Sequence, residues 1–164
     1  MQPEFNPREI QFGIGLGNPG KEYGNTYHNV GHLFIDYMNG KNPELKYKFK
    51  KSTVFMNESG RFVFEEFLKF TNLKAQNLLV VHDDSDLALG RFKLSFGSGS
   101  AGHKGVQSVI DALKTKNFWR LRIGVRSPQE KNRQKAEDFV LKTIKSSDKK
   151  ILLEVFEKIR NQLA

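Results

Sequence analysis

The feature that most constrains the fold is the alternation of strand-like and helix-like segments along the chain. Short apolar runs of strand length are separated by segments in which apolar residues recur at helical spacing. The predicted strands are 10–16, 53–56, 77–82, 91–96 and 118–125, and the predicted helices are 33–38, 59–70, 106–114 and 146–163. This alternation predicts an α/β fold with a mixed, mostly parallel sheet that is covered by helices. Ser59 is a plausible N-cap of the second helix.

The length of the chain bounds the number of domains. A chain of 164 residues usually builds one core, so we expect residues 1–164 to form a single domain. The absence of cysteine excludes disulfides, thiolate nucleophiles and cysteine-ligated zinc, and it is consistent with a reducing compartment. We find no signal-peptide pattern and no apolar run near the roughly 18 residues of a membrane span. We therefore expect a cytoplasmic protein that does not enter a membrane.

The charge balance favours a polyanionic partner. The chain has 27 Lys and Arg against 18 Asp and Glu, a formal charge of +9 at pH 7. A surplus of this size attracts polyanions, which makes nucleic acid the leading partner class; a solvated basic face is the alternative. Residues 101–135 contain only two acidic residues and these basic ones: Lys104, Lys114, Lys116, Arg120, Arg122, Arg126, Lys131, Arg133 and Lys135.

Two glycine-rich loops raise the question of a nucleotide cofactor. Gly15, Gly17 and Gly20 form a GxGxxG, but "KEYGNTYHN" delays the helix that would hold a pyrophosphate, and no carboxylate follows the next predicted strand. The second loop, 97–105, lacks the GK[ST] of a P-loop. We expect no nucleotide cofactor.

Polar side chains lie where the predicted strands end. Asn18, Asn57 and Asp83 follow successive strands, and His28 begins the first helix. In open α/β sheets the carboxyl ends of strands form ligand sites, so these residues can converge. A histidine oriented by a carboxylate can deprotonate water, and asparagine amides can hold a carbonyl or an oxyanion. Because the chain has no cysteine and no GxSxG elbow, the predicted chemistry is direct attack by water. Taken alone, each of these four polar residues could instead be an ordinary turn or cap residue.

Two further patterns resemble metal sites without completing them. His28 and His32 are four residues apart, but "HNVGH" lacks the glutamate of HExxH and a third ligand. The run "DDSD" at 83–86 lacks the glycine and distal glutamate of an EF-hand loop. We predict no metal.

Four segments taken together resemble a known family. "GLGNPGKEYGNTYHNVG", "STVFMNESG", "VVHDDSDLALG" and "GSAGHKG" are similar, in this order, to the signature segments of bacterial-type peptidyl-tRNA hydrolases. The resemblance implies a monomeric, three-layer α/β sandwich enzyme without a cofactor. It implies that the substrate is peptidyl-tRNA, bound through the acceptor stem and 3′ end, and that the enzyme hydrolyses the ester between peptide and tRNA.

The resemblance also implies roles for individual residues. His28 would be the general base, Asp83 its orienting partner, and Asn57 a residue that orders the site and helps to bind the substrate. The remaining substrate-binding residues would be Asn18, Tyr23, Met56, His103 and Lys104. Arg122 would bind a tRNA phosphate, with Lys93 or Arg120 as the second cation.

The chain departs from the family pattern at several places. Lys104 replaces an asparagine, Ser95 replaces a basic residue of the phosphate clamp, Tyr27 replaces an arginine, and the segment 40–52 is short. Lys104 and the basic stretch allow a second hypothesis, a non-catalytic tRNA- or RNA-binding relative. Retention of His28, Asp83, Asn18 and Asn57 favours catalysis, because a protein that only binds RNA has no need of this set.

Overall fold

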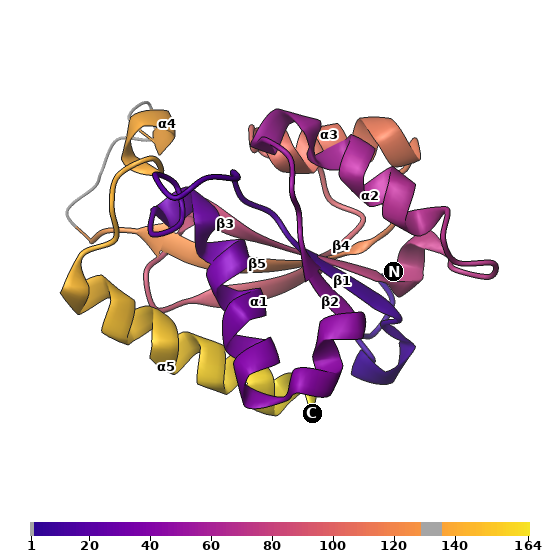
Figure 1. Cartoon of the computed structure of the whole chain (residues 1–164), viewed down its shortest axis with the longest axis horizontal. Helices are drawn as coiled ribbons and strands as arrows, with labels where there is room; N and C mark the ends of the chain where they lie inside the picture. The colour runs from indigo at the N-terminus through magenta and orange to yellow at the C-terminus, as the bar shows by residue number, and fades with distance from the viewer. Residues whose placement is uncertain (1, 129–135) are drawn as a thin grey trace.

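A computed structural model describes residues 2–128 and 136–164, without the side chains of Lys46, Tyr47 and Ala136. Within these residues one five-stranded sheet has the order β2-β1-β3-β5-β4 (Figure 1). The strands are β1 Phe12–Gly15, β2 Phe49–Lys51, β3 Leu78–Ala88, β4 Phe92–Phe96 and β5 Trp119–Arg126. β1, β2, β3 and β5 are parallel, and β4 pairs antiparallel with β5 at the edge. The mixed, mostly parallel sheet predicted from the sequence is confirmed.

Helices cover both faces of the sheet. The α-helices are α1 Val30–Lys41, α2 Ser59–Phe67, α3 Lys104–Leu113, α4 Ala136–Phe139 and α5 Ser146–Leu163. Short 3-10 helices are Pro7–Glu9, Tyr27–Asn29, Pro43–Tyr47, Met56–Glu58 and Ala75–Asn77. In Figure 1, α2 and α3 lie on one side of the sheet and α1 and α5 on the other, which gives the three layers.

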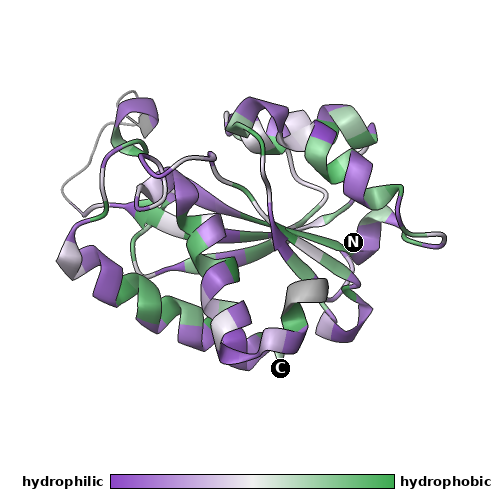
Figure 2. Ribbon diagram, viewed as in Figure 1, coloured by the Kyte–Doolittle hydropathy of each residue, from purple (hydrophilic) through white to green (hydrophobic). Residues whose placement is uncertain are grey.

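The central strand β3 shows why both faces need a helical layer. Leu79 and Val81 pack with α1 and α5, whereas Leu78 and Val80 pack with α2 and α3. A strand buried on both faces has a continuous apolar run rather than an alternating one. Figure 2 shows that β3 then changes from hydrophobic to hydrophilic along its length, because its second half contains His82 and the "DDSD" run.

The predicted strand 53–56 is wrong. The strand beside β1 is formed instead by residues 49–51, and Ser52 makes the last sheet-like bond by donating its N–H to the Gly15 carbonyl at 2.9 Å. The Phe49 ring occupies the space over Gly13, 2.4 Å from where a Cβ would stand. Packing of Phe49 on a glycine therefore selects the edge strand, and the apolar run that follows it leaves the sheet.

Other helix and strand boundaries also differ from prediction, most clearly in α2 and β3. Ser59 is the first residue of α2 rather than its N-cap, which is Glu58, and its hydroxyl donates to the Met56 carbonyl at 2.7 Å. α2 ends at Phe67, short of the predicted residue 70. β3 continues past His82, so that Asp83 lies within the strand, because β5 is long enough to pair with it as far as Ala88.

Residues 129–135, which include Lys131, Arg133 and Lys135 of the basic stretch, lie outside the described residues. Within the part of the chain that the structure describes, no helix is both long and apolar enough to span a membrane.

Candidate active site

Asp83 is the centre of a buried group of polar side chains. Its side chain is 3% exposed, and each carboxylate oxygen contacts a different imidazole. Oδ2 lies 2.8 Å from Nδ1 of His28, and Oδ1 lies 2.8 Å from Nε2 of His103. The structure therefore brings together the predicted pair His28 and Asp83. It adds His103 as a second partner of the same carboxylate.

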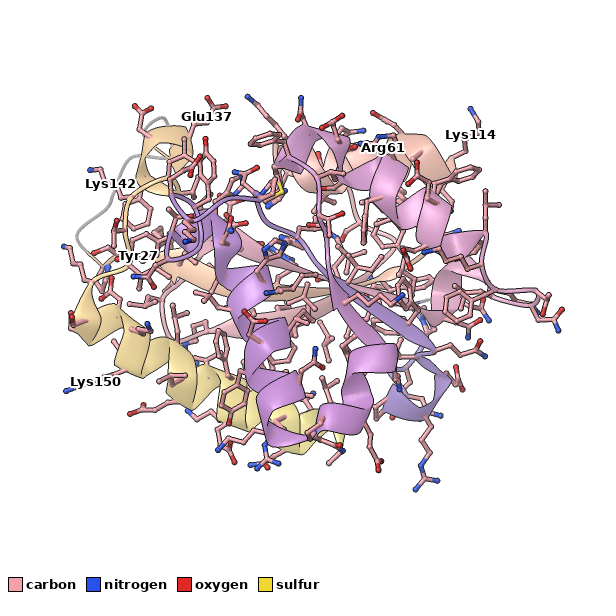
Figure 3. All side chains as sticks on the ribbon, viewed as in Figure 1. Tyr27, Arg61, Lys114, Glu137, Lys142 and Lys150 are labelled. Atoms are coloured by element: carbon pink, nitrogen blue, oxygen red, sulfur yellow. The ribbon has the colours of Figure 1, made fainter. Side chains whose placement is uncertain are left out.

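The backbone of the segment 26–29 is tied to the chain that follows α4, and this tie positions His28. The N–H of His28 donates to the Val140 carbonyl at 2.7 Å, and that of Tyr27 donates to the Lys142 carbonyl at 3.3 Å. Tyr27, labelled in Figure 3, is buried, and its ring stacks on Phe139 with a centroid separation of 4.5 Å. Tyr27 thus contributes to packing rather than to the charge of the site.

The first glycine loop positions Asn18. Gly20 has φ of +107°, a conformation that side chains rarely adopt, and this lets the chain turn sharply after Asn18. Oδ1 of Asn18 accepts the Met56 N–H at 2.8 Å. Asn29, which the sequence reading missed, donates to the Asn18 carbonyl at 2.9 Å and accepts its N–H at 2.8 Å. Among the described residues no hydrogen bond uses the Asn18 amide NH₂, so this group is available to a ligand. The turn and these bonds account for the glycines of the loop without a bound nucleotide.

The segment around Met56 is only partly as predicted. Met56 is buried, and its Sδ lies 2.4 Å from where a Cβ on Gly105 would stand, so it packs directly on the start of α3. Asn57 is exposed, and within the described residues it makes no hydrogen bond to His28 or Asp83. The structure thus gives no support for Asn57 as a residue that orders the site. Tyr23 is half-buried, and its ring packs edge-on against exposed Phe55.

The electrostatics of the group keep the acid charged and increase the affinity of the base for a proton. Burial raises the pKa of Asp83, but His28 and His103 together hold that pKa well below its ordinary value. Burial lowers the pKa of His28, but the Asp83 carboxylate outweighs it, and the pKa ends above its ordinary value of 6.5. Lys104, exposed at the first position of α3, opposes Asp83 and lowers the pKa of His28.

The hydrogen-bond partners also assign the tautomer of His28 in its neutral form. An ionised carboxylate can only accept, so Nδ1 of His28 carries the proton and Nε2 keeps a free lone pair. That lone pair is the group that can take a proton from water.

Arg120 has a different role from the one predicted. It is 4% exposed, and its guanidinium donates to Ser98 Oγ at 2.6 Å, to the Gly99 carbonyl at 2.9 Å and to Nε2 of His82 at 3.3 Å. A guanidinium that is buried and bonded in this way cannot reach a tRNA phosphate. The assignment of Arg120 as a phosphate ligand is therefore wrong, and its contacts hold the second glycine loop instead.

His82 connects Arg120 to the site. Its Nδ1 donates to the Asp83 carbonyl at 2.7 Å, and burial lowers its pKa well below the ordinary value, so it is neutral. Its ring contacts that of His103 edge-on, with centroids 4.8 Å apart. No local sequence pattern indicates this link.

Arg122 and Lys93 remain as candidate phosphate ligands. They are directly opposite each other on β5 and β4, so their side chains share one face of the sheet. Arg122 is half-buried, and it donates to Asp84 Oδ2 at 2.7 Å and to Ser95 Oγ at 3.1 Å. Ser95 thus supports Arg122, and Asp84 neutralises part of its charge. Lys93 is exposed.

The metal-binding capacity of the group is limited by these hydrogen bonds. The ligand atoms of His28, Asp83 and His103 lie within 4.8 Å of one another. However, the carboxylate already shares a proton with each imidazole, so a metal would have to displace both protons. His32, the other half of the HxxxH pattern, instead bonds Ser52 Oγ at 3.0 Å. We assign no metal site.

A separate cavity lies away from this group. It is lined by side chains that include Ile10, Met38, Phe49 and Leu163, and by none of the predicted site residues. Its walls are mostly apolar and lack a base paired with an acid. The catalytic candidate is therefore the group around Asp83.

Comparison with known proteins gives a consistent result. The family model described as Peptidyl-tRNA hydrolase matches residues 12–164. The peptidyl-tRNA hydrolase of Coprothermobacter proteolyticus is 37% identical over an alignment 170 residues long that covers 92% of this chain and 85% of the relative. That of Aquifex aeolicus is 36% identical, with 92% of this chain and 86% of the relative covered.

Solved structures agree with these sequence matches. The crystal structure of peptidyl-tRNA hydrolase from Acinetobacter baumannii is similar with a TM-score of 0.79 and 25% sequence identity. The similarity covers 98% of this chain and 89% of that one.

Proposed function

Since this chain belongs to the peptidyl-tRNA hydrolase family, it is an enzyme that hydrolyses peptidyl-tRNA, and we propose that His28 carries out the central proton transfer. The observation that carries this assignment is the 2.8 Å contact between His28 Nδ1 and the buried Asp83 carboxylate. It leaves Nε2 unprotonated and directed away from Asp83, as a general base requires.

The proposed reaction is a direct hydrolysis. Nε2 of His28 removes a proton from water while the water oxygen attacks the ester carbonyl carbon. The tetrahedral intermediate then collapses, the bond to the tRNA 3′ oxygen breaks, and the imidazolium returns its proton to that oxygen. The products are a free peptide carboxyl and a tRNA hydroxyl, and Asp83 stays ionised throughout because it stabilises the imidazolium.

Four neighbouring residues are proposed to hold the peptide and the 3′ end. The free amide NH₂ of Asn18 would donate to a peptide carbonyl, because its Oδ1 is already occupied by Met56. Lys104, beside His28, would donate to a carbonyl or a phosphate oxygen. Tyr23 and Asn57, neither of them buried, would contact the terminal nucleotide.

The tRNA acceptor stem is proposed to bind through Arg122 and Lys93. The guanidinium of Arg122, although paired with Asp84, still attracts a phosphate, but more weakly than an unpaired guanidinium would. We expect tRNA affinity to fall with salt, and to fall less steeply in Arg122→Ala. Lys158→Ala, which removes an exposed lysine from α5, is the matched control. An unchanged slope in Arg122→Ala would remove Arg122 from the interface.

The non-catalytic alternative is less well supported. A protein that only binds RNA has no use for a buried carboxylate that fixes the tautomer of a partly exposed histidine. The decisive experiment compares cleavage of N-blocked aminoacyl-tRNA and free aminoacyl-tRNA by the native protein and His28→Ala. We expect selective cleavage of the blocked substrate, lost in the variant, with tRNA binding and thermal unfolding unchanged. Cleavage that does not depend on His28 would refute the assignment.

We further propose one domain over residues 1–164, acting as a cytoplasmic monomer. One continuous sheet with helices on both faces supports the first part, and the resemblance to the family supports the second. Sedimentation at the chain mass of 18.8 kDa would test the monomer.

A further inference from the structure

His103 uses its two ring nitrogens for two different tasks. It is the N-cap of α3, where its Nδ1 accepts the N–H of Val106 at 3.2 Å. Its Nε2 contacts Oδ1 of Asp83 at 2.8 Å. The side chain is 11% exposed, so few solvent molecules compete for either bond.

The helix cap dictates where the proton of His103 lies. A backbone N–H can only donate, so Nδ1 of His103 must present a lone pair. The proton of the neutral ring is then on Nε2, which makes His103 a donor to Asp83. The first turn of α3 therefore imposes one tautomer on a residue that faces the catalytic acid.

We propose that His103 is a positioning residue for His28: through the tautomer that α3 imposes, it fixes the plane of the Asp83 carboxylate and moderates the attraction of that carboxylate for a proton on His28. This inference rests on the proposed role of His28 as the base.

The physical argument concerns how one carboxylate is shared. Because one oxygen of Asp83 is held by His103, the other faces His28 in a fixed direction. A carboxylate that also accepts a hydrogen bond from a second donor is stabilised by it, and it attracts a proton on the first partner less strongly. Without His103, Asp83 would hold the protonated form of His28 more strongly, and a larger fraction of the base would be occupied by a proton near neutral pH.

Other charged or titratable groups near the pair come from three elements. Lys104 on α3 and Arg120 on β5 are cations, and His82 on β3 is neutral and bonded to the Asp83 carbonyl. A substitution at residue 103 leaves the charges of these groups unchanged, and the two variants described next show whether a change in the titration of His28 follows the bond to Asp83 or the helix cap.

Two substitutions separate the tasks of the ring. In His103→Asn, Oδ1 lies near the position of Nδ1 and can still cap α3, but the side chain is too short to reach Asp83. In His103→Gln, the terminal amide can reach Asp83 as a donor from the position of Nε2, but the cap is lost. Both variants have a carboxamide side chain, but His103→Asn loses the bond to Asp83 and His103→Gln loses the helix cap.

The measurements are the dependence of kcat/KM on pH and an NMR titration of the His28 ring in the free protein. In His103→Asn we expect the apparent pKa of His28 to rise by about half a pH unit to one unit, which lowers kcat/KM about three- to tenfold below that pKa. In His103→Gln we expect His28 to titrate as in the native protein, and we expect a lower melting temperature because the helix cap is lost.

Three outcomes decide the matter. If the pKa of His28 in His103→Asn equals that in the native protein, the proposal is overturned. It is also overturned if both variants lose the same activity at every pH and the loss follows their melting temperatures. An upward shift in His103→Asn that His103→Gln does not share would support it. His28→Ala in the same assay separates the proposal about His28 from the proposal about His103. Residual cleavage in this variant contradicts the role of His28 as the base, whereas the NMR titration still tests His103.

Discussion

Asp83→Asn is the change whose consequence the structure defines most sharply. The amide has nearly the shape of the carboxylate, but one of its two ends donates instead of accepting. His103 decides which end faces which partner: its Nε2 must donate, because its Nδ1 is occupied by the Val106 N–H. The amide oxygen therefore turns to His103 and the amide NH₂ turns to His28.

The expected loss follows from that orientation. Facing an NH₂ group, Nδ1 of His28 must accept, so its proton moves to Nε2 and the ring can no longer take a proton from water. Loss of a general base typically costs about 10² to 10⁴ in rate, or about 3 to 5 kcal/mol in the barrier. Since both bonds are 2.8 Å long and Asp83 is buried, little water is present to restore the original tautomer, and we expect the upper part of this range.

The assay is single-turnover cleavage of N-blocked aminoacyl-tRNA, with tRNA binding and thermal unfolding as controls for the fold. A second variant tests the orientation itself. In Asp83→Asn combined with His103→Asn, no donor holds the amide oxygen, so the amide can rotate and part of the activity, about tenfold over the single variant, should return. A loss of less than tenfold in Asp83→Asn would refute the reasoning, and so would a double variant slower than the single one.

Three further predictions concern binding and stability. Asp84→Asn should release the charge of Arg122, and a fluorescence-anisotropy titration should show tighter tRNA binding at low salt and a steeper salt dependence; no change would mean that the ion pair is irrelevant to binding. Gly60→Ala should destabilise by about 1 to 3 kcal/mol, because its Cβ would stand 2.0 Å from a backbone oxygen of α3, whereas Gly40→Ala, with no atom within 4 Å, should be neutral or stabilising in the same urea titration. His32 is mostly buried, and burial above all lowers its pKa to about 4, so the unfolded chain binds more protons between pH 6.5 and 4. Stability should fall as pH falls through this window by up to about 3 kcal/mol, and His32→Gln should show a shallower slope.

Much of the architecture was predictable from local patterns. The spacing of apolar residues in 30–41, 104–113 and 146–163 distinguishes helices from the apolar run of β3, because the two periodicities are properties of neighbouring residues. The family motifs also identified His28 and Asp83, and the structure brings the two into contact.

The edge strand was not predictable in the same way. The run 53–56 has the composition of a strand, yet residues 49–51 pair with β1, because the Phe49 ring fits over Gly13. That preference depends on a contact between residues far apart in the sequence, and the local propensity of 53–56 could not oppose it.

The sequence by itself determined the types of element, the family and the residue types available for chemistry. Tertiary structure decided how those residues are used. Arg120 and Arg122 are two positions apart on one strand, but Arg120 is buried and supports the loop, whereas Arg122 is only half-buried and pairs with Asp84. His103 became a partner of Asp83 only because the start of α3 meets β3 at that point. Directions of hydrogen bonds and degrees of burial are set by which elements pack together, and that information is absent from local sequence patterns.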